Sequence, residues 1–392
     1  MKRKSLNIGL IGSGFMGQAH ADAFRRAALL YRDLPAIPVM HTLADATQEL
    51  ADAAAARFGF ARATSDWRAM IADPEIDIVD ITTPNAMHAE MALAAIAAGK
   101  HVYCEKPLTV KLEDATALLE AAERRGVKTM MAFNNIKTPA ALLARQLIER
   151  GDIGTPTRFR GWFDQGFFND PEMPWSWRCS REQAGSGSLG DLGSHVISVA
   201  QFLMGDIESV SAQQQTFFKT RPAAGGGSGY GASADLGGQR LEVENEDQFQ
   251  SLVQFANGAG GTIESSRIAA GKIFGVYWEI SGTEGTIVMD GERFNELKIA
   301  RYGDQKHDRG FKTLLAGSQV EQFGGFFGFD FAGGGLGYFD VKVIEVHDLI
   351  HGVMGREGCF PDFRFGWENQ RIIAAMERSA FEDRRVRIGE VA

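Results

Sequence analysis

The chain has 392 residues, of which 44% are hydrophobic and 23% are charged. This length exceeds what one compact hydrophobic core usually accommodates, so two domains are expected. A formal net charge of -9 gives no electrostatic reason to expect a nucleic acid or an anionic membrane as a partner. No apolar run approaches the roughly 20 residues that cross a bilayer, and three widely spaced cysteines argue against a disulfide framework, so a cytoplasmic location is expected.

The first third of the chain alternates short apolar segments with helical patterns. Strands are expected at Leu6–Gly12, Val39–Asp45, Asp77–Pro84, 101–107 and 128–134, with helices between them that end at glycines such as Gly59 and Gly99. Strands that alternate with glycine-terminated helices are typical of right-handed βαβ units. Residues 1–135 are therefore expected to form a Rossmann-type, doubly wound parallel sheet, in a protein of the α/β class.

The pattern changes after Gly151, where period-two strands and hairpin signals such as Asn257-Gly258 replace the alternation. Residues 136–392 are expected to form an α+β domain with a large, mostly antiparallel sheet, and residues 187–205 a helix after its first strand. The Gly-rich tract 223–239 is expected to be a flexible loop. Residues 323–340 mix glycines with aromatics, which fits a packed loop either at a subunit contact or near the functional site.

A glycine pattern of the form G-x-G-x-x-G joins the first predicted strand to the first predicted helix. Its glycines permit a tight turn and a close approach of the backbone to a pyrophosphate at the positive end of the helix. The pattern alone is weak, but here it begins a series of βαβ units. It predicts dinucleotide binding by Gly12, Ser13, Gly14, Phe15, Met16 and Gly17.

Asp45 is the candidate for binding the ribose of the dinucleotide. Such an acid usually follows the glycines by about 20 residues; Asp45 comes later, but "ALLYRDLPAIP" reads as an insertion and Asp45 ends the second predicted strand. A carboxylate there accepts hydrogen bonds from ribose hydroxyls and repels a 2′-phosphate, which favours NAD over NADP. The alternative is an N-cap for the next helix, and the two roles are compatible.

Lys106 is the first candidate for the chemistry itself. Glu105 and Lys106 end the fifth predicted strand, so they reach the same sheet edge as the glycine turn and as "TTPNAMH" at Thr82–His88. A lysine there can donate a hydrogen bond to a substrate hydroxyl and stabilise the alkoxide that forms as hydride leaves. The alternative is a solvated lysine paired with the neighbouring glutamate.

Asp191 and His195 are four residues apart in "GSGSLGDLGSHVIS" and share one face of the predicted helix. A histidine oriented by a carboxylate is a good proton acceptor near neutral pH. The alternative is a capping aspartate and a core histidine. The glycines just upstream and the separate candidate Lys106 favour the functional interpretation.

Several segments together resemble one family. "GLIGSGFMGQAHA", "CEKPLT", "GDIG", "GSGSLGDLGSH" and "ISGTEGTI" occur in the order found in the Gfo/Idh/MocA oxidoreductases, and the resemblance covers nearly the whole chain. It implies an NAD-dependent dehydrogenase that oxidises a secondary hydroxyl of a sugar, anhydrosugar or glycoside to a ketone. In that interpretation His195 is the general acid/base, Asp191 orients it and contacts substrate, and Lys106 holds the reacting hydroxyl.

The resemblance also implies a set of binding residues and an assembly. The cofactor contacts carry over to Gly12, Ser13, Gly14, Phe15, Met16, Gly17, Asp45, Thr82, Thr83, Pro84, Asn85, His88, Glu105, Lys106 and Asn134. The substrate contacts are expected at Lys106, Asn135, Trp177, Arg178, Asp191 and His195, although Trp177 and Arg178 could equally be packing residues. A homodimer or homotetramer formed through the C-terminal sheet is expected.

Within the family, "SDWRAMIADPEID" and "PWSWR" resemble the glycoside 3-dehydrogenases, the group that includes levoglucosan dehydrogenase. Two departures bear on specificity: Asn135-Ile136-Lys137 replaces a frequent Tyr-Arg-Arg, and Ser198 replaces a frequent aspartate. Myo- or scyllo-inositol dehydrogenase is the alternative enzyme, and a non-catalytic, dinucleotide-responsive regulator is the alternative from another class. His347 and His351 have the spacing of a metal pair, but the sequence offers no evident third ligand, so no metal is expected.

Overall fold

The computed structural model describes residues 3–226, 233–320, 323 and 334–391. The chain divides into two compact units. The first contains Met1–Lys137 and Leu336–Glu368, and the second contains Thr138–Val320 and Asn369–Ala392. Their architectures confirm the predicted class, a parallel Rossmann sheet followed by a mostly antiparallel sheet.

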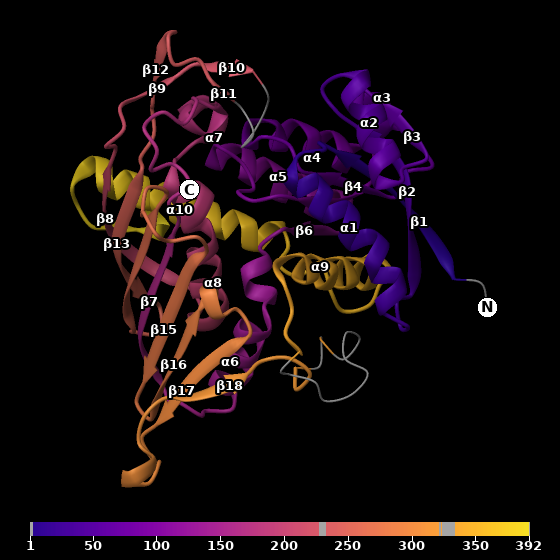
Figure 1. The fold of residues 1–392 in the computed structure, drawn as a ribbon. Helices are drawn as coiled ribbons and strands as arrows, with labels where there is room; N and C mark the ends of the chain where they lie inside the picture. Colours follow the sequence, from indigo (N-terminus) through magenta and orange to yellow (C-terminus); the bar gives the residue numbers. More distant parts are fainter. Residues whose placement is uncertain (1–2, 227–232, 321–322, 324–333, 392) are drawn as a thin grey trace. The chain divides into compact units, whose positions relative to one another are not determined.

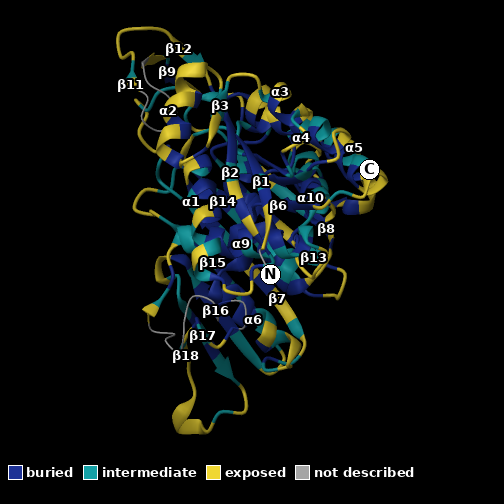
Figure 2. Cartoon of the chain, turned by 90° about the vertical axis from the view of Figure 1, so that its right-hand side faces the viewer, coloured by how far each residue is buried: buried dark blue, intermediate teal, exposed yellow. Residues whose placement is uncertain are grey.

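The first unit is built on a six-stranded parallel sheet with the order β3-β2-β1-β4-β5-β6. Its strands are β1 (Lys4–Ile11), β2 (Ala36–Ala44), β3 (Arg62–Thr64), β4 (Ile78–Ile81), β5 (His101–Cys104) and β6 (Thr129–Met131). The central strands are buried on both faces, which explains their continuous apolar sequences (Figure 2). The strand order reverses between β1 and β4, and in such sheets ligands bind at the carboxyl ends of the strands beside this reversal.

Helices cover this sheet, and their ends follow the expected capping chemistry. They are α1 (Phe15–Leu30), α2 (Gln48–Phe58), α3 (Trp67–Ala72), α4 (His88–Ala97), α5 (Leu112–Arg125) and α9 (Tyr338–Val353), with the 3-10 turns Asn85–Met87 and Asn134–Lys137. The hydroxyl of Thr47 caps α2 by accepting from the backbone N–H of Leu50, and Gly59 ends α2 with a φ of 80°. Gly99 likewise has a φ of 77°, so both predicted helix ends are confirmed.

The boundary between the units falls after Lys137, two residues later than expected, and one further segment is divided differently. Leu336–Glu368, expected in the second domain, belongs to the first unit because α9 packs beside α1 (Figure 1). The apolar face of α9, including Val343 and Ile350, joins Phe24 and Tyr31 in the hydrophobic core of that unit. A segment remote in sequence thus supplies one side of the Rossmann core.

The second unit is built on a nine-stranded sheet with the order β18-β17-β16-β15-β7-β14-β13-β8-β19, in which only β7 and β14 pair in parallel. Its strands are β7 (Pro156–Asp164), β8 (Ile207–Gln215), β13 (Gln248–Phe255), β14 (Gly260–Ser266), β15 (Gly275–Gly282), β16 (Gly285–Asp290), β17 (Glu296–Arg301), β18 (Lys312–Leu315) and β19 (Val386–Arg387). The predicted Asn257-Gly258 turn connects β13 to β14, with Gly258 at a φ of 90°.

The helical elements of this unit include a π-helical turn at Leu189–Gly193 that continues into α8 (Ser194–Met204). The others are α6 (Pro139–Glu149), α7 (Arg181–Ala184), the later part of α10 (Phe363–Glu382), and the 3-10 turns Trp177–Cys179, Gly291–Arg293, Lys306–Asp308 and Ile388–Glu390. Alternate side chains of β7, among them Phe159 and Phe163, are buried on the sheet face that α8 covers. The opposite face is polar and partly exposed.

The Gly-rich tract 223–239 is more ordered than expected in its described part. Ala224–Gly226 (β10) pairs with Ser233–Ala234 (β11), and Thr220–Pro222 (β9) pairs with Arg240–Glu242 (β12). Residues 227–232 and most of the aromatic tract 323–340 lie outside the described residues. None of the helices in the described part of the chain combines the length and the apolar character needed to cross a membrane.

Candidate active site

The glycine turn of the first unit has the geometry that a dinucleotide requires. Gly12 has a φ of 96°, a conformation that favours glycine, and a methyl group at Gly17 would lie 2.1 Å from the carbonyl oxygen of Gly12. Gly14 is the N-cap of α1, makes no side-chain cap, and borders open space. The first backbone N–H groups of α1 are thus left for a ligand, and a pyrophosphate fits this positive helix end.

The carboxylate of Asp45 is held against this turn. Its Oδ2 accepts from the backbone N–H of Ser13 at 2.8 Å, and its Oδ1 accepts from that of Ala46 at 2.7 Å. Asp45 is not the N-cap of α2, because Thr47 fills that position. The capping alternative is therefore wrong, and the carboxylate instead lies beside the glycine turn, where a ribose-binding acid is expected.

The loop after β4 supports the glycine turn. The hydroxyl of Thr82 donates a hydrogen bond of 2.9 Å to the carbonyl oxygen of Gly12. Asn85 is buried at the start of a 3-10 turn. His88 is fully buried, with Nδ1 2.9 Å from the carbonyl oxygen of Pro107 and Nε2 2.9 Å from that of Thr83. Burial lowers the pKa of His88, although the two carbonyl oxygens act in the opposite direction. The ring thus lies between the loops that follow β4 and β5.

Glu105 points into the interior of the first unit. Its Oε1 lies 3.0 Å from the ammonium of Lys342 and 3.1 Å from Nε2 of His20, and its Oε2 accepts from the backbone N–H of Lys106 at 3.1 Å. Burial alone would raise the pKa of Glu105, but Lys342 and His20 outweigh it and hold the pKa well below its usual range. The charged, buried carboxylate of Glu105 thus holds the backbone of Lys106 in place.

These contacts belong to a larger buried network. Nδ1 of His20 lies 2.9 Å from Asp80, the ammonium of Lys342 lies 3.0 Å from Glu345, and the Tyr103 hydroxyl donates to Glu345 at 2.6 Å. With His20 and Lys342 charged, the network sets two cations against three carboxyl groups, those of Asp80, Glu105 and Glu345. Burial raises the pKa of both Asp80 and Glu345, and the neighbouring cations offset this only in part.

The buried network around Glu105 was not predicted from the sequence. One signal was available: Asp80 is a charged residue in the otherwise apolar strand "IVDI", and such an acid needs a buried partner. Lys342 and Glu345 are three residues apart on α9, but nothing in the sequence links that helix to Glu105.

Asn134 and Asn135 lie in the 3-10 turn after β6 and are 2% and 4% exposed. Lys137, in the same turn, is also buried and forms an ion pair of 2.6 Å with Asp348 on α9. Its charge is therefore neutralised within the first unit. The segment 135–137 is thus a packed element of this unit, stabilised by an ion pair.

In the second unit, Asp191 and His195 lie on the π-helical turn and the first turn of α8. Glu246, in the loop before β13, holds this turn by two hydrogen bonds. Its carboxylate accepts from the N–H of Leu189 at 2.9 Å, and its carbonyl oxygen accepts from the N–H of Ser188 at 3.1 Å. A methyl group on Gly187 would lie 2.0 Å from that carbonyl, so the approach requires glycine there. π-helical turns recur at functional sites because they re-aim side chains.

The surroundings of this pair are specific. The carboxylate of Asp191 lies 3.5 Å from Nε of Arg178, and the His195 ring contacts Phe163 edge to face at 5.8 Å. The guanidinium of Arg178 also lies 4.4 Å from the centre of the Trp177 ring. The hydroxyl of Ser198 donates to the carbonyl oxygen of His195 at 2.7 Å, so this residue bonds its own helix. The expected residues Trp177, Arg178, Asp191 and His195 are thus grouped within one unit.

The position of Arg178 is fixed by a buried ion pair. Arg267 and Asp247, 2% and 0% exposed at their side chains, are joined at 3.0 Å. Arg267 and Asn245 both donate to the carbonyl oxygen of Arg178, at 3.2 and 2.9 Å. The loop that carries Trp177 and Arg178 is therefore held by its backbone.

Two family models match this chain, one in each of the two units. Residues 6–133 match the model described as an oxidoreductase family with an NAD-binding Rossmann fold, and residues 141–288 match the GFO/IDH/MocA C-terminal domain. Levoglucosan dehydrogenase of Pseudarthrobacter phenanthrenivorans is 40% identical over 390 residues, which cover 99% of this chain and 100% of the relative. The scyllo-inositol 2-dehydrogenase (NAD(+)) of Bacillus subtilis is 28% identical over 294 residues, 74% of this chain and 75% of the relative.

Solved structures agree over the full length. An NAD binding oxidoreductase from Klebsiella pneumoniae is 61% identical, with a TM-score of 0.92 and coverage of 99% of both chains. Levoglucosan dehydrogenase in complex with NADH and levoglucosan is 40% identical, with a TM-score of 0.92, and covers 98% of this chain and 100% of its own.

Proposed function

Because the chain belongs to the GFO/IDH/MocA family of NAD-binding oxidoreductases, we propose that it oxidises a secondary hydroxyl of an anhydrosugar or glycoside to a ketone, with levoglucosan the first substrate to test. The supporting observation is the 40% identity to a levoglucosan dehydrogenase over 99% of the chain, together with Lys106, Asp191 and His195 in this sequence. In the reverse direction the same groups would reduce the ketone.

In the proposed reaction, His195 takes the proton of the reacting hydroxyl and Asp191 orients the imidazole. Lys106 donates a hydrogen bond to the same oxygen and stabilises the negative charge that develops there. Bound NAD supplies the hydride acceptor, held by the glycine turn and by the carboxylate of Asp45. Lys106 belongs to the first unit and His195 to the second.

The arrangement around each group supports its role. The backbone of Lys106 is held by the buried carboxylate of Glu105, and Asp191 is held on a π-helical turn capped by Glu246. Arg178 beside Asp191 and the indole of Trp177 suit the hydroxyls and the C–H face of a sugar ring. Each proposed contact is thus made by a side chain whose own backbone is fixed.

The proposed assembly is a homodimer or homotetramer through the open face of the nine-stranded sheet. That face carries the stacked rings of Trp162 and Tyr277, 4.0 Å apart, and Leu252, which is 65% exposed. Aromatic and aliphatic side chains on an otherwise polar sheet face are typical of the centre of an interface. A cytoplasmic location, supported by three buried free thiols, remains part of the proposal.

The decisive experiment measures NADH absorbance during incubation with NAD or NADP and a panel of levoglucosan, glucosides, free hexoses and inositols. Turnover of levoglucosan or a glucoside with NAD is expected. Turnover of inositols alone would replace the proposal with the inositol dehydrogenase alternative. Binding of NAD without turnover of any substrate in either direction would favour a dinucleotide-responsive regulator, which has no need of a proton acceptor such as His195.

A further inference from the structure

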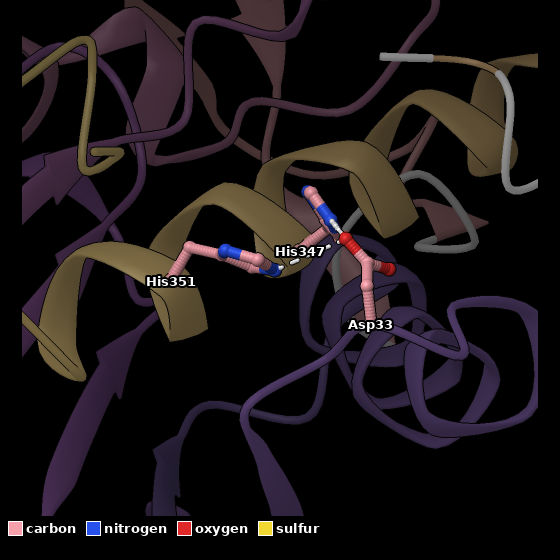
Figure 3. A group of neighbouring side chains, drawn as sticks. All are labelled: Asp33, His347 and His351. Atoms are coloured by element: carbon pink, nitrogen blue, oxygen red, sulfur yellow. Dashed lines mark hydrogen bonds and ion pairs between the residues drawn. The ribbon is translucent and has the colours of Figure 1, made fainter. Parts of the chain in front are cut away.

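Three side chains of the first unit converge on one point outside the proposed chemistry. His347 and His351 lie one helical turn apart on α9, and Asp33 lies in the segment just after α1 (Figure 3). The sequence provided the histidine pair, but the acid is more than 300 residues away along the chain and was not foreseen.

The separations match those of ligands around a first-row transition metal. Oδ2 of Asp33 lies 3.4 Å from Nε2 of His347 and 3.6 Å from Nε2 of His351. Bonds of about 2.0–2.1 Å in a tetrahedral arrangement place two ligand atoms about 3.3 Å apart. The same carboxylate oxygen and two imidazole nitrogens are therefore already spaced as three of four tetrahedral ligands.

Hydrogen bonding around His347 leaves its other nitrogen aimed at the centre of the group. Nδ1 of His347 lies 3.0 Å from the carboxylate of Asp348 and therefore donates to it. Nε2 lies 3.4 Å from Oδ2 of Asp33, and in the tautomer with its proton on Nδ1 it directs a lone pair to the centre of the group. A metal ion at that centre takes both this nitrogen and the carboxylate oxygen as ligands, and a histidine whose second nitrogen donates to a carboxylate is the usual arrangement at zinc.

His351 also directs its Nε2 toward the carboxylate of Asp33. Its Nε2 is buried and makes no hydrogen bond, and it lies on the side of the ring that faces Asp33. The rings of His347 and His351 are 4.3 Å apart, and Tyr31, the residue that ends α1, packs against the His347 ring at 4.0 Å. The two histidines are therefore held in place by packing. The side chain of Asp33 is 63% exposed, so water can reach the fourth coordination position of a metal bound here.

A second group of the same composition offers a contrast. His41, Asp73 and Glu75 also lie close together, but the guanidinium of Arg62 is 3.1 Å from both carboxylates. The charge of that group is already compensated by a protein cation. In the group on α9, the contacts to Asp33 given by the structure come from the two imidazoles.

We propose that Asp33, His347 and His351 form a site for a divalent transition metal, with zinc as the representative ion, which links the segment after α1 to α9. Nitrogen and carboxylate ligands in this number select zinc, nickel or copper over magnesium and calcium. The site joins two segments that the chain brings together only in the folded state, so binding of the metal stabilises the first unit.

The test uses the full-length protein with its affinity tag removed and its metals stripped with EDTA. Titration calorimetry with zinc chloride is expected to show one tight site per chain, and zinc but not magnesium is expected to raise the melting temperature. Asp33→Asn and His351→Gln preserve side-chain size and are each expected to weaken zinc binding by at least about 100-fold, as loss of a ligand exceeds the 10–100-fold effect of outer partners. His307→Gln, at an exposed histidine beside Asp308, is the matched control and is expected to bind as the original protein does.

Two outcomes would overturn the proposal: no zinc binding by the original protein, or equal binding by the original protein and both ligand variants. Circular dichroism establishes that each variant is folded. Cobalt gives a second measurement, because a tetrahedral site produces intense visible absorption, which both ligand variants are expected to lose. The three cysteines do not compete, since all are buried and burial raises the pKa of each thiol.

Discussion

The ammonium of Lys342 lies 3.0 Å from Oε1 of Glu105, although the two residues are 237 positions apart in the chain. Glu105 directly precedes the proposed catalytic Lys106, and Lys342 comes from α9, a helix that follows nearly all of the second unit in sequence. The contact shows that the Glu-Lys-Pro motif is supported from inside the Rossmann unit by the carboxy-terminal part of the chain.

Glu105→Gln is expected to destabilise the protein by about 3–5 kcal/mol, because it leaves the buried Lys342 without one of its two carboxylates. Chemical denaturation followed by circular dichroism measures the change. Glu113→Gln, an exposed glutamate in the first turn of α5, is the matched control and should change stability by less than about 1 kcal/mol. Equal effects of the two substitutions would show that the buried network does not stabilise the fold.

His195→Asn is expected to lower kcat by about 10²- to 10⁴-fold, since it removes the proposed proton acceptor while keeping a polar side chain of similar size. Lys106→Met should produce a comparable loss. Both variants should retain NAD binding, measured by quenching of tryptophan fluorescence. A near-normal kcat in either variant would contradict the assigned role of that residue.

Asp45→Asn is expected to relax the preference for NAD over NADP, because the amide removes the charge that repels a 2′-phosphate. The substitution keeps an oxygen that can accept from the N–H of Ser13, so the glycine turn is preserved. The ratio of kcat/KM for the two cofactors measures the effect. An unchanged ratio would mean that Asp45 does not face the ribose.

Glu377 gives the second unit a pH-dependent stability. Burial, followed by the nearby Glu246 carboxylate, raises the pKa of Glu377 from 4.5 to about 7. Because the folded state holds this proton more tightly than the unfolded chain, stability falls as the pH rises from about 4.5 through 7. In Glu377→Gln this decrease should be smaller, as seen in melting temperatures recorded across that range; identical pH profiles for the two proteins would exclude the effect.

Leu252→Asp is expected to convert the assembly to monomers, because it places a charge within the proposed interface on the open sheet face. Light scattering coupled to size-exclusion chromatography measures the mass. The exposed Leu29 on α1 provides the control substitution, Leu29→Asp, which should leave the assembly unchanged. A monomeric original protein, or an unaffected oligomer in Leu252→Asp, would argue against this interface.

Much of the fold was predictable because it depends on local sequence patterns. Continuous apolar strands predicted the parallel sheet, and glycines at helix ends predicted where α2 and α4 stop. The glycine turn was identified in its correct place between β1 and α1, and the Asp191–His195 spacing was identified on a helix. The π-helical form of that turn was not foreseen, since its first N–H groups bond Glu246, which lies in the loop before β13 and is remote in sequence.

The sequence by itself determined the strand and helix periods, the glycine turn and the residue types available for proton transfer, because each depends on neighbours within a few positions. Only the tertiary structure decided that α9 belongs with the first unit, that Lys342 compensates Glu105, and that Asp33 completes a group with His347 and His351. The physical reason is that charge compensation and metal ligation act between side chains brought together by packing. Their partners can be anywhere along the chain, and no local pattern marks them.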